Sequence, residues 1–124
     1  MRTVAALLVS VVFALAGCGG DGDGETTNGT SSQTLSISES DFTLTPSTVT
    51  VDAPGTYTFE AMNDGGVDHA LEIEGNGIEE RTDTIAPGES ASVNVDLEAG
   101  TYEMYCPISN HRDLGMSGEI TVSG

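Results

Sequence analysis

The stretch from Cys106 to Met116, CPISNHRDLGM, carries a thiol, an imidazole at His111 and a thioether at intervals of five residues. Sulfur donors of the Cys and Met kind bind soft transition metals such as copper, and imidazole suits copper, zinc and iron. The two equal spacings allow one loop to fold back so that the three side chains converge. The sequence therefore predicts a metal site close to its C-terminal end.

A second histidine, His69, adds another donor of this chemistry. It has the same parity as Leu71 and Ile73, and Cys106 has the same parity as Met104. Because alternate residues of a strand face one side, both donors are expected to point inward from strand ends. Two histidines, a cysteine and a methionine suit copper in a trigonal site with a long axial thioether, the arrangement of blue electron-transfer centres. A structural zinc site would more often use four Cys or His ligands, and three are available.

The elements that must position these donors are predicted to be strands. From residue 34 onward apolar and polar residues alternate with period two, and turn-forming sequences at 53–56, 86–89 and 98–101 separate the runs. Pro46 marks a bulge or an edge. This pattern predicts an all-β, antiparallel sandwich or barrel of seven or eight strands, without an amphipathic helix of useful length. The runs are 35–38, 42–44, 49–51, 57–61, 71–74, 93–97, 102–104 and 120–122.

Two segments carry a resemblance to a known family: GTYEMYCPISNHRDLGMSGEITV at 100–122 and MNDGGVDHALEI at 62–73. From about residue 34 to 124 the chain resembles the cupredoxins of the plastocyanin and halocyanin kind. The resemblance implies a Greek-key β-sandwich that holds one type 1 copper. It implies that His69, Cys106, His111 and Met116 are the copper ligands. It also implies an electron carrier that cycles between Cu(II) and Cu(I), rather than an enzyme.

Each proposed ligand also has a simpler interpretation when taken alone. Cys106 would be a small buried hydrophobic residue, His69 a turn histidine and Met116 a core residue. Copper is favoured because all of them fall at the family's ligand positions. Two departures from the family concern the rigidity of the loops: Ala70 stands where many members have Asn, and residues 109–110 are Ser-Asn where many have Pro-Gly.

The first residues of the chain are typical of a signal peptide. An apolar run from Val4 to Ala16 is too short to span a bilayer, and it ends in Leu-Ala-Gly-Cys at 15–18. This ending resembles the lipobox of prokaryotic lipoproteins, which predicts a signal peptide over 1–17 and a lipid on Cys18. The alternative is an ordinary secretory signal with a chance cysteine. No twin-arginine pair is present, so we expect export by the general pathway and anchoring at the outer face of the cell membrane.

Residues 18–33 are predicted to be a disordered tether, because GGDGDGETTNGTSSQ holds no large apolar residue. A flexible linker of this length has an r.m.s. reach of roughly 20–25 Å, enough to let a domain over 34–124 pivot above a membrane. Asn28 begins a glycosylation sequon, Asn-Gly-Thr, a short motif that often occurs by chance.

The charge excludes one class of partner. The chain has 20 acidic residues, two histidines and three basic residues, none of them lysine, for a net charge of −17. Such a surface repels nucleic acid and anionic lipid and suits a basic partner. It also suits a salt-loaded habitat, where self-repulsion is screened, and we favour this halophilic interpretation over a docking field. Glu79, Glu80 and Asp83 are expected to form part of a solvated face rather than a calcium site.

Three functions follow from these observations. The favoured one is a monomeric electron carrier that docks redox proteins near His111, with Ile108 and Leu114 as an apolar patch or, equally, as ordinary loop packing. The second is a copper-delivery lipoprotein, although the tether lacks the Met- and His-rich tracts that such proteins often use. The third, a copper enzyme, would need further histidines for a second copper, and the chain has only two.

Overall fold

The computed structural model describes residues 33–124. The predicted signal peptide, the lipidated Cys18, the sequon at Asn28 and all but the last residue of the predicted tether lie outside the described residues. Within 33–124 no helix is long and apolar enough to cross a membrane.

Nine strands and one helical turn make up the described part of the chain. Their bounds are β1 (Gln33–Ser40), β2 (Thr43–Thr45), β3 (Thr48–Val51), β4 (Gly55–Asn63), β5 (Glu72–Gly75), β6 (Ile78–Arg81), β7 (Ser90–Leu97), β8 (Gly100–Tyr105), α1 (His111–Leu114) and β9 (Ser117–Val122).

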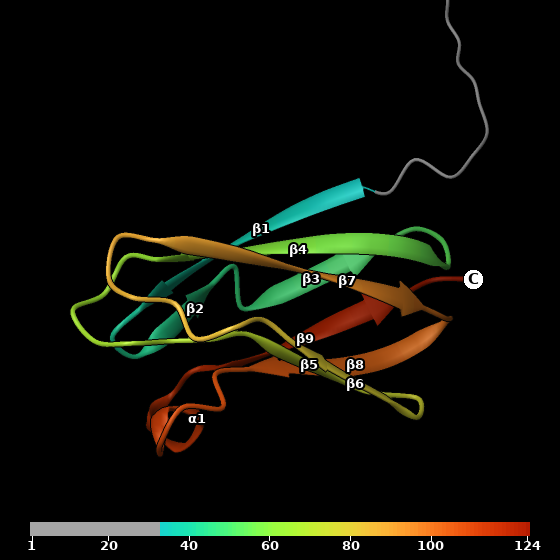
Figure 1. Ribbon diagram of the computed structural model, residues 1–124. Coiled ribbons are helices and arrows are strands. Elements are labelled where there is room, and N and C mark those ends of the chain that lie inside the picture. Colours follow the sequence, from blue (N-terminus) through green and yellow to red (C-terminus); the bar gives the residue numbers. More distant parts are fainter. Residues whose placement is uncertain (1–32) are drawn as a thin grey trace, which may run out of the picture. The chain divides into compact units, whose positions relative to one another are not determined.

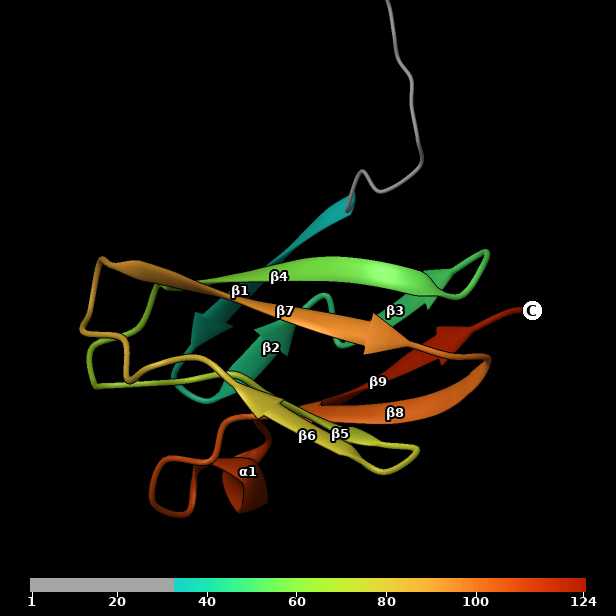
Figure 2. The ribbon, with the colours of Figure 1, turned by 45° about the vertical axis from the view of Figure 1, so that its right-hand side comes forward.

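The strands form two sheets that face each other, as Figures 1 and 2 show from two directions. One sheet has the order β2-β1-β4-β7 and the other has the order β3-β9-β8-β5-β6. The predicted β-sandwich is confirmed. Both sheets are mixed rather than purely antiparallel, because β1 pairs in parallel with β4 and β3 pairs in parallel with β9.

The segment around Pro46 explains the mixed pairing. The predicted runs 42–44 and 49–51 correspond to β2, which joins β1, and to β3, which joins β9 in the other sheet. Pro46 lies between them and has no N–H to donate to a ladder, so a continuous strand is disfavoured there. The chain therefore changes sheets at this point, and β4 then returns beside β1 in the same direction.

Strand β6 has no counterpart among the predicted runs. It pairs with β5 through a turn in which Asn76 and Gly77 have positive φ of 46° and 84°. Its residues include Glu79 and Glu80, both exposed as expected for a solvated face. An edge strand with no buried position lacks the apolar alternation on which the prediction depends.

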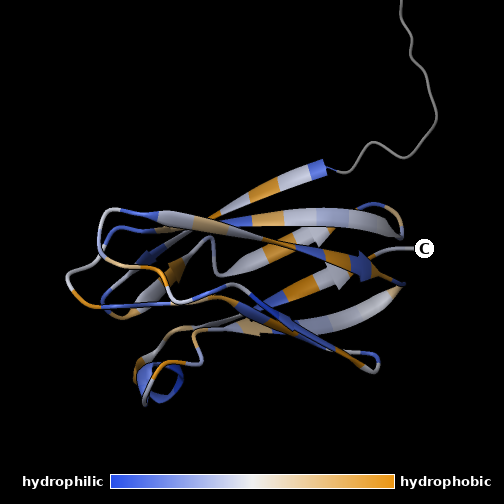
Figure 3. Cartoon of the chain, viewed as in Figure 1, coloured by the Kyte–Doolittle hydropathy of each residue, from blue (hydrophilic) through white to orange (hydrophobic). Residues whose placement is uncertain are grey.

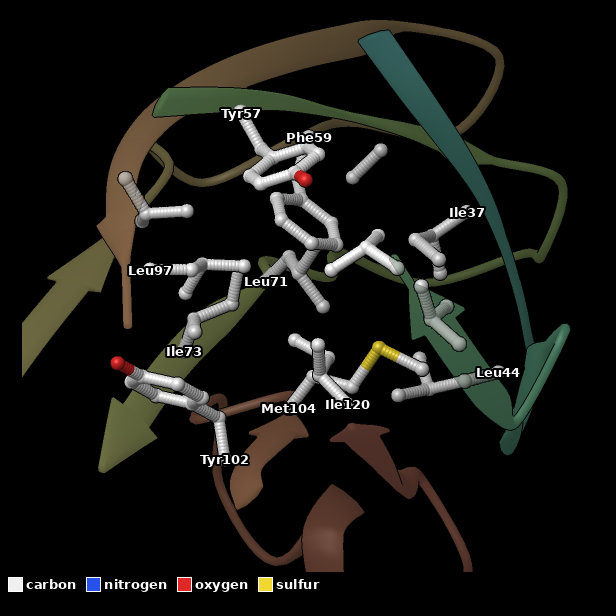
Figure 4. Packing of buried hydrophobic residues seen from close by; sticks show 14 of the residues in the cluster. Ile37, Leu44, Tyr57, Phe59, Leu71, Ile73, Leu97, Tyr102, Met104 and Ile120 are labelled. Atoms are coloured by element: carbon white, nitrogen blue, oxygen red, sulfur yellow. The ribbon is translucent and has the colours of Figure 1, made fainter. Parts of the chain in front are cut away.

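The core lies between the two sheets (Figure 4). Phe59, Leu71, Met104 and Ile120 are completely buried. Each such side chain contributes about 1.5–3 kcal/mol relative to exposure. Figure 3 shows apolar and polar segments alternating along several strands, whereas α1 is hydrophilic. Figures 1 and 2 place α1 at the end of the sandwich that lies away from the C-terminus.

Candidate metal centre

The structure brings three of the predicted ligands together. Nδ1 of His69 lies 3.2 Å from Nδ1 of His111, and Sγ of Cys106 lies 3.8 Å from the first nitrogen and 3.6 Å from the second. His69 and Cys106 are completely buried, and 8% of His111 is exposed. His69 comes from the β4–β5 connection, whereas Cys106 at the end of β8 and His111 at the start of α1 belong to one loop near the C-terminus.

Main-chain hydrogen bonds explain the equal spacing of Cys106, His111 and Met116. The Cys106 N–H donates to the Met116 carbonyl at 3.0 Å, and the Met116 N–H donates to the His111 carbonyl at 3.1 Å. Gly115 ends the helical turn at a φ of 129°, a conformation that glycine adopts readily. The loop therefore closes on itself, and Met116, which is bonded through its main chain to Cys106 and His111, is completely buried.

His69 is held by main-chain bonds and by a carboxylate. Its N–H donates to the Ile85 carbonyl and its carbonyl accepts from the Ile85 N–H, at 3.1 Å and 2.7 Å. Nε2 of its ring lies 2.8 Å from Oδ1 of Asp41. An ionised carboxylate only accepts, so Nε2 carries the proton and Nδ1 is left with its lone pair facing Cys106 and His111. This is the tautomer that binds a metal through Nδ1.

Asp41 could not be predicted as a partner of His69 from the sequence, because it stands 28 residues before His69 and no motif joins the two. Its other oxygen, Oδ2, accepts from the Gly66 N–H at 2.8 Å. The bond from Gly66 is the main cause that lowers the pKa of Asp41, and the bond to His69 adds to it. The carboxyl group is therefore ionised at neutral pH.

Phe42 is a second residue that the sequence did not single out. Its ring centroid lies 4.9 Å from that of His111 in a tilted arrangement and 6.2 Å from that of His69, edge to face. The ring is partly buried and packs against the core. Aromatic packing on both imidazoles limits their movement and keeps water from this side of the cluster.

Asn63 organises the loop that carries His69. It is completely buried. Its side-chain amide donates to the carbonyls of Val67 and Ile85 and accepts from the Gly65 N–H, each at 2.8 Å. Every polar atom of this side chain is thus used to fix the chain before His69. Ala70, which follows His69, has no polar side chain that could add to these bonds.

Burial governs the electrostatics of the donors. It raises the pKa of the Cys106 thiol, an effect opposed by the backbone amides of Ile108 and Ala70 beside the sulfur. Burial also lowers the pKa of His111, and the neighbouring His69 lowers it further. In the metal-free protein, burial therefore favours the neutral thiol of Cys106 and the neutral imidazole of His111. A bound metal would replace the thiol proton, since it is the thiolate that ligates.

The donor set and its distances fit copper. An ion at about 2.0 Å from each nitrogen and about 2.3 Å from the sulfur, the lengths of comparable zinc bonds, would have angles of about 105–125° between these three ligands. Such angles are close to trigonal, and a trigonal His₂Cys set with a neighbouring Met is typical of blue copper. The cluster is consistent with one type 1 copper held by His69, Cys106, His111 and Met116.

The surface around His111 combines apolar and charged groups. Leu114 is 51% exposed, whereas Ile108 is partly buried against the core. Arg112 forms an ion pair with Glu103, and its guanidinium lies 4.1 Å from the centroid of the Tyr105 ring. Of the two residues predicted to form an apolar patch, Leu114 presents more of its side chain to solvent.

Comparisons with known proteins agree with this geometry. Residues 5–122 match the family model described as "Cupredoxin-like domain". No curated protein sequence matches the chain. Auracyanin B is similar in structure, with a TM-score of 0.67 and 20% identity over 79% of this chain and 94% of that one.

Two further solved structures extend the comparison. Auracyanin A, a "blue" copper protein from the photosynthetic bacterium Chloroflexus aurantiacus, has a TM-score of 0.64 and 17% identity over 75% of this chain and all of its own. A copper-containing nitrite reductase from Thermus scotoductus has a TM-score of 0.56 and 16% identity over 75% of this chain, but only 28% of its own. The same fold therefore occurs in small blue copper proteins and within larger enzymes.

Proposed function

The chain belongs to the family of cupredoxin-like domains, and from this we propose that it is a type 1 copper protein that carries single electrons between redox partners. The observation that carries the proposal is the buried convergence of His69, Cys106 and His111 on one point. Copper held there would supply a one-electron couple between Cu(II) and Cu(I).

The residues around the cluster favour electron transfer over metal exchange. Main-chain bonds fix the loop from Cys106 to Met116, and a carboxylate and two main-chain bonds fix His69. Donors that cannot move keep similar positions in both oxidation states, so little rearrangement accompanies each electron. Preorganisation of this kind reduces the barrier to transfer.

His111 is the proposed point of electron entry and exit. It is the one donor of the three that reaches solvent, at 8% exposure, and the exposed Leu114 lies on the same helical turn. A redox protein that packs on Leu114 would approach the edge of this imidazole. The net charge of −17 favours a partner with a basic docking face.

We place the protein among carriers rather than enzymes. Enzymes that share the fold, such as nitrite reductases and multicopper oxidases, need a second copper bound by additional histidines. Both histidines of this sequence lie in the one cluster. The chain also matches auracyanin B over 94% of that protein, the size of a single small domain.

The proposed location is the outer face of the cell membrane, through a lipid on Cys18. The apolar run before Leu-Ala-Gly-Cys supports it. Partition of the native protein into the detergent phase, lost in Cys18→Ser, is the expected result. Recovery of the unaltered protein in the aqueous phase would exclude the anchor.

Visible absorption and EPR of the protein with one equivalent of Cu(II) test the electron-carrier proposal. An intense blue thiolate-to-copper band with narrow hyperfine splitting is expected. Cys106→Ser should abolish both, while Cys18→Ser, which removes the other cysteine, should leave both unchanged. A pale protein with weakly bound copper would reject the type 1 site and favour metal delivery.

A further inference from the structure

The Asp41 carboxylate bridges two segments around the metal centre. Oδ1 lies 2.8 Å from Nε2 of His69, and Oδ2 accepts from the Gly66 N–H at 2.8 Å. Asp41 follows β1 and precedes β2, whereas Gly66 and His69 lie in the β4–β5 connection. Each carboxylate oxygen therefore has its own partner, and the two bonds together fix the orientation of the carboxylate toward the His69 ring.

Gly65 shows that the chain leaves room for this pair. A Cβ at residue 65 would stand 2.2 Å from Oδ1 of Asp41 and 2.9 Å from Nε2 of His69, both too close for any side chain. The main chain thus approaches the carboxylate and the imidazole where they meet, and only glycine permits this approach. Glycine at residue 65 therefore leaves Asp41 and His69 the room to form their bond.

The carboxylate also decides which ring nitrogen carries the proton. If His69 held its proton on Nδ1, a lone pair on Nε2 would face the carboxylate oxygen 2.8 Å away, which is repulsive. The Nδ1 proton would then also point into the ligand cluster. With the proton on Nε2, the bond to Asp41 forms and Nδ1 is free to bind a metal.

We propose that Asp41 is a positioning residue of the copper centre, which fixes His69 in its metal-binding tautomer and favours Cu(II) over Cu(I) through its negative charge. The inference rests on the proposed function and deepens it. A carboxylate on the far nitrogen makes the ligating nitrogen more basic and adds one negative charge near the metal. Both effects stabilise the more highly charged ion, so the reduction potential is lower than it would be without Asp41.

The first test uses the copper-free protein and no substitution. Nitrogen-15 NMR of the imidazoles distinguishes a protonated from an unprotonated ring nitrogen. His69 is expected to be protonated on Nε2 and unprotonated on Nδ1. Observation of the opposite tautomer would overturn the inference, and this result does not depend on whether the copper site is blue.

The second test compares two charge-removing variants. Asp41→Asn keeps the size of the side chain and removes its charge, and Asp68→Asn removes an exposed carboxylate next to His69 in the chain for which no bond to the ring exists. For Asp41→Asn we expect Cu(II) affinity to fall 10- to 100-fold, the usual effect of losing such a partner. Cu(I) affinity should change less, and a tenfold selective loss raises the potential by about 59 mV.

The control decides between a specific bond and general charge. Asp68→Asn should leave the tautomer unchanged and shift the potential less than Asp41→Asn. Equal shifts in the two variants, or a potential in Asp41→Asn equal to that of the unaltered protein, would overturn the positioning role. If the unaltered protein with Cu(II) shows no blue band, the proposed function is rejected. The tautomer measurement on the copper-free protein still tests the bond between Asp41 and His69.

Discussion

Glu39 provides a stability prediction because the fold buries its carboxyl group without compensation. The side chain is completely buried in β1, on the same face as Ile37, and neither carboxylate oxygen has a hydrogen-bond partner among residues 33–124. Burial raises the pKa of Glu39 from its ordinary 4.5 to about 8. The folded protein therefore holds this proton at neutral pH, whereas the unfolded chain releases it.

The difference between the folded and unfolded pKa of Glu39 makes the stability of the protein depend on pH. Because the folded state binds the proton more tightly, the stability contribution is fully present below pH 4.5 and is lost as the pH rises to about 8. One pKa unit corresponds to about 1.4 kcal/mol, so this group alone should lower the free energy of unfolding by about 4 kcal/mol between pH 5 and pH 9. Above pH 9 the loss stays constant.

The assay compares the copper-free protein with Glu39→Gln by urea unfolding at pH 5, 7 and 9, at constant salt. The amide has the same shape and does not titrate, so the variant keeps the pH dependence of all the other groups. From pH 5 to pH 9 the variant should gain about 4 kcal/mol relative to the unaltered protein. Parallel stability curves for the two proteins would refute the assignment of a proton to buried Glu39.

Two further predictions concern the loop and the surface. Asn63→Ala removes three hydrogen bonds of a buried side chain and should lower the free energy of unfolding by about 2–3 kcal/mol in urea, whereas Asn94→Ala on the exposed face of β7 should change it by about 0.5 kcal/mol or less. If the two substitutions lowered the free energy of unfolding equally, the role of Asn63 in fixing the loop before His69 would be contradicted. Leu114→Arg should slow electron self-exchange, measured by NMR in high salt, about tenfold without altering the blue band. Met62→Arg, at a residue 47% exposed on β4, should leave the rate unchanged, and a similar loss in both variants would exclude a docking patch at Leu114.

The fold was largely accessible from the sequence because burial imposes a period of two on strands with one face in the core. Tyr57, Phe59 and Ala61 in β4 follow this rule and are buried. The exposed edge strand β6 does not, and it was missed. The direction of pairing was also beyond reach, since alternation is the same in parallel and antiparallel strands.

The site was accessible in part, for a related reason. His69 and His111 are the only histidines of the sequence and Cys106 is its only cysteine outside the predicted lipobox, so their parity and spacing are informative. Asp41 and Phe42 are common residues that act through contacts with distant parts of the chain. Glu39 is one of 20 acidic residues and nothing in its sequence surroundings distinguishes it, so its burial is known only from the structure.

The hydrogen bond from the Cys106 N–H to the Met116 carbonyl has a consequence for how such a protein can vary. It closes the ligand loop at its base, where the chain leaves β8 and enters β9, and the contacts of Ile108 and Arg112 hold the loop against the sandwich. Substitutions of the exposed Ser109 and Asn110 would change the surface of the loop while β8 and β9 keep their register. The residues that hold the ligands and the residues that a partner would meet are therefore different members of one short loop, so the surface of the loop can vary while the ligand positions stay the same.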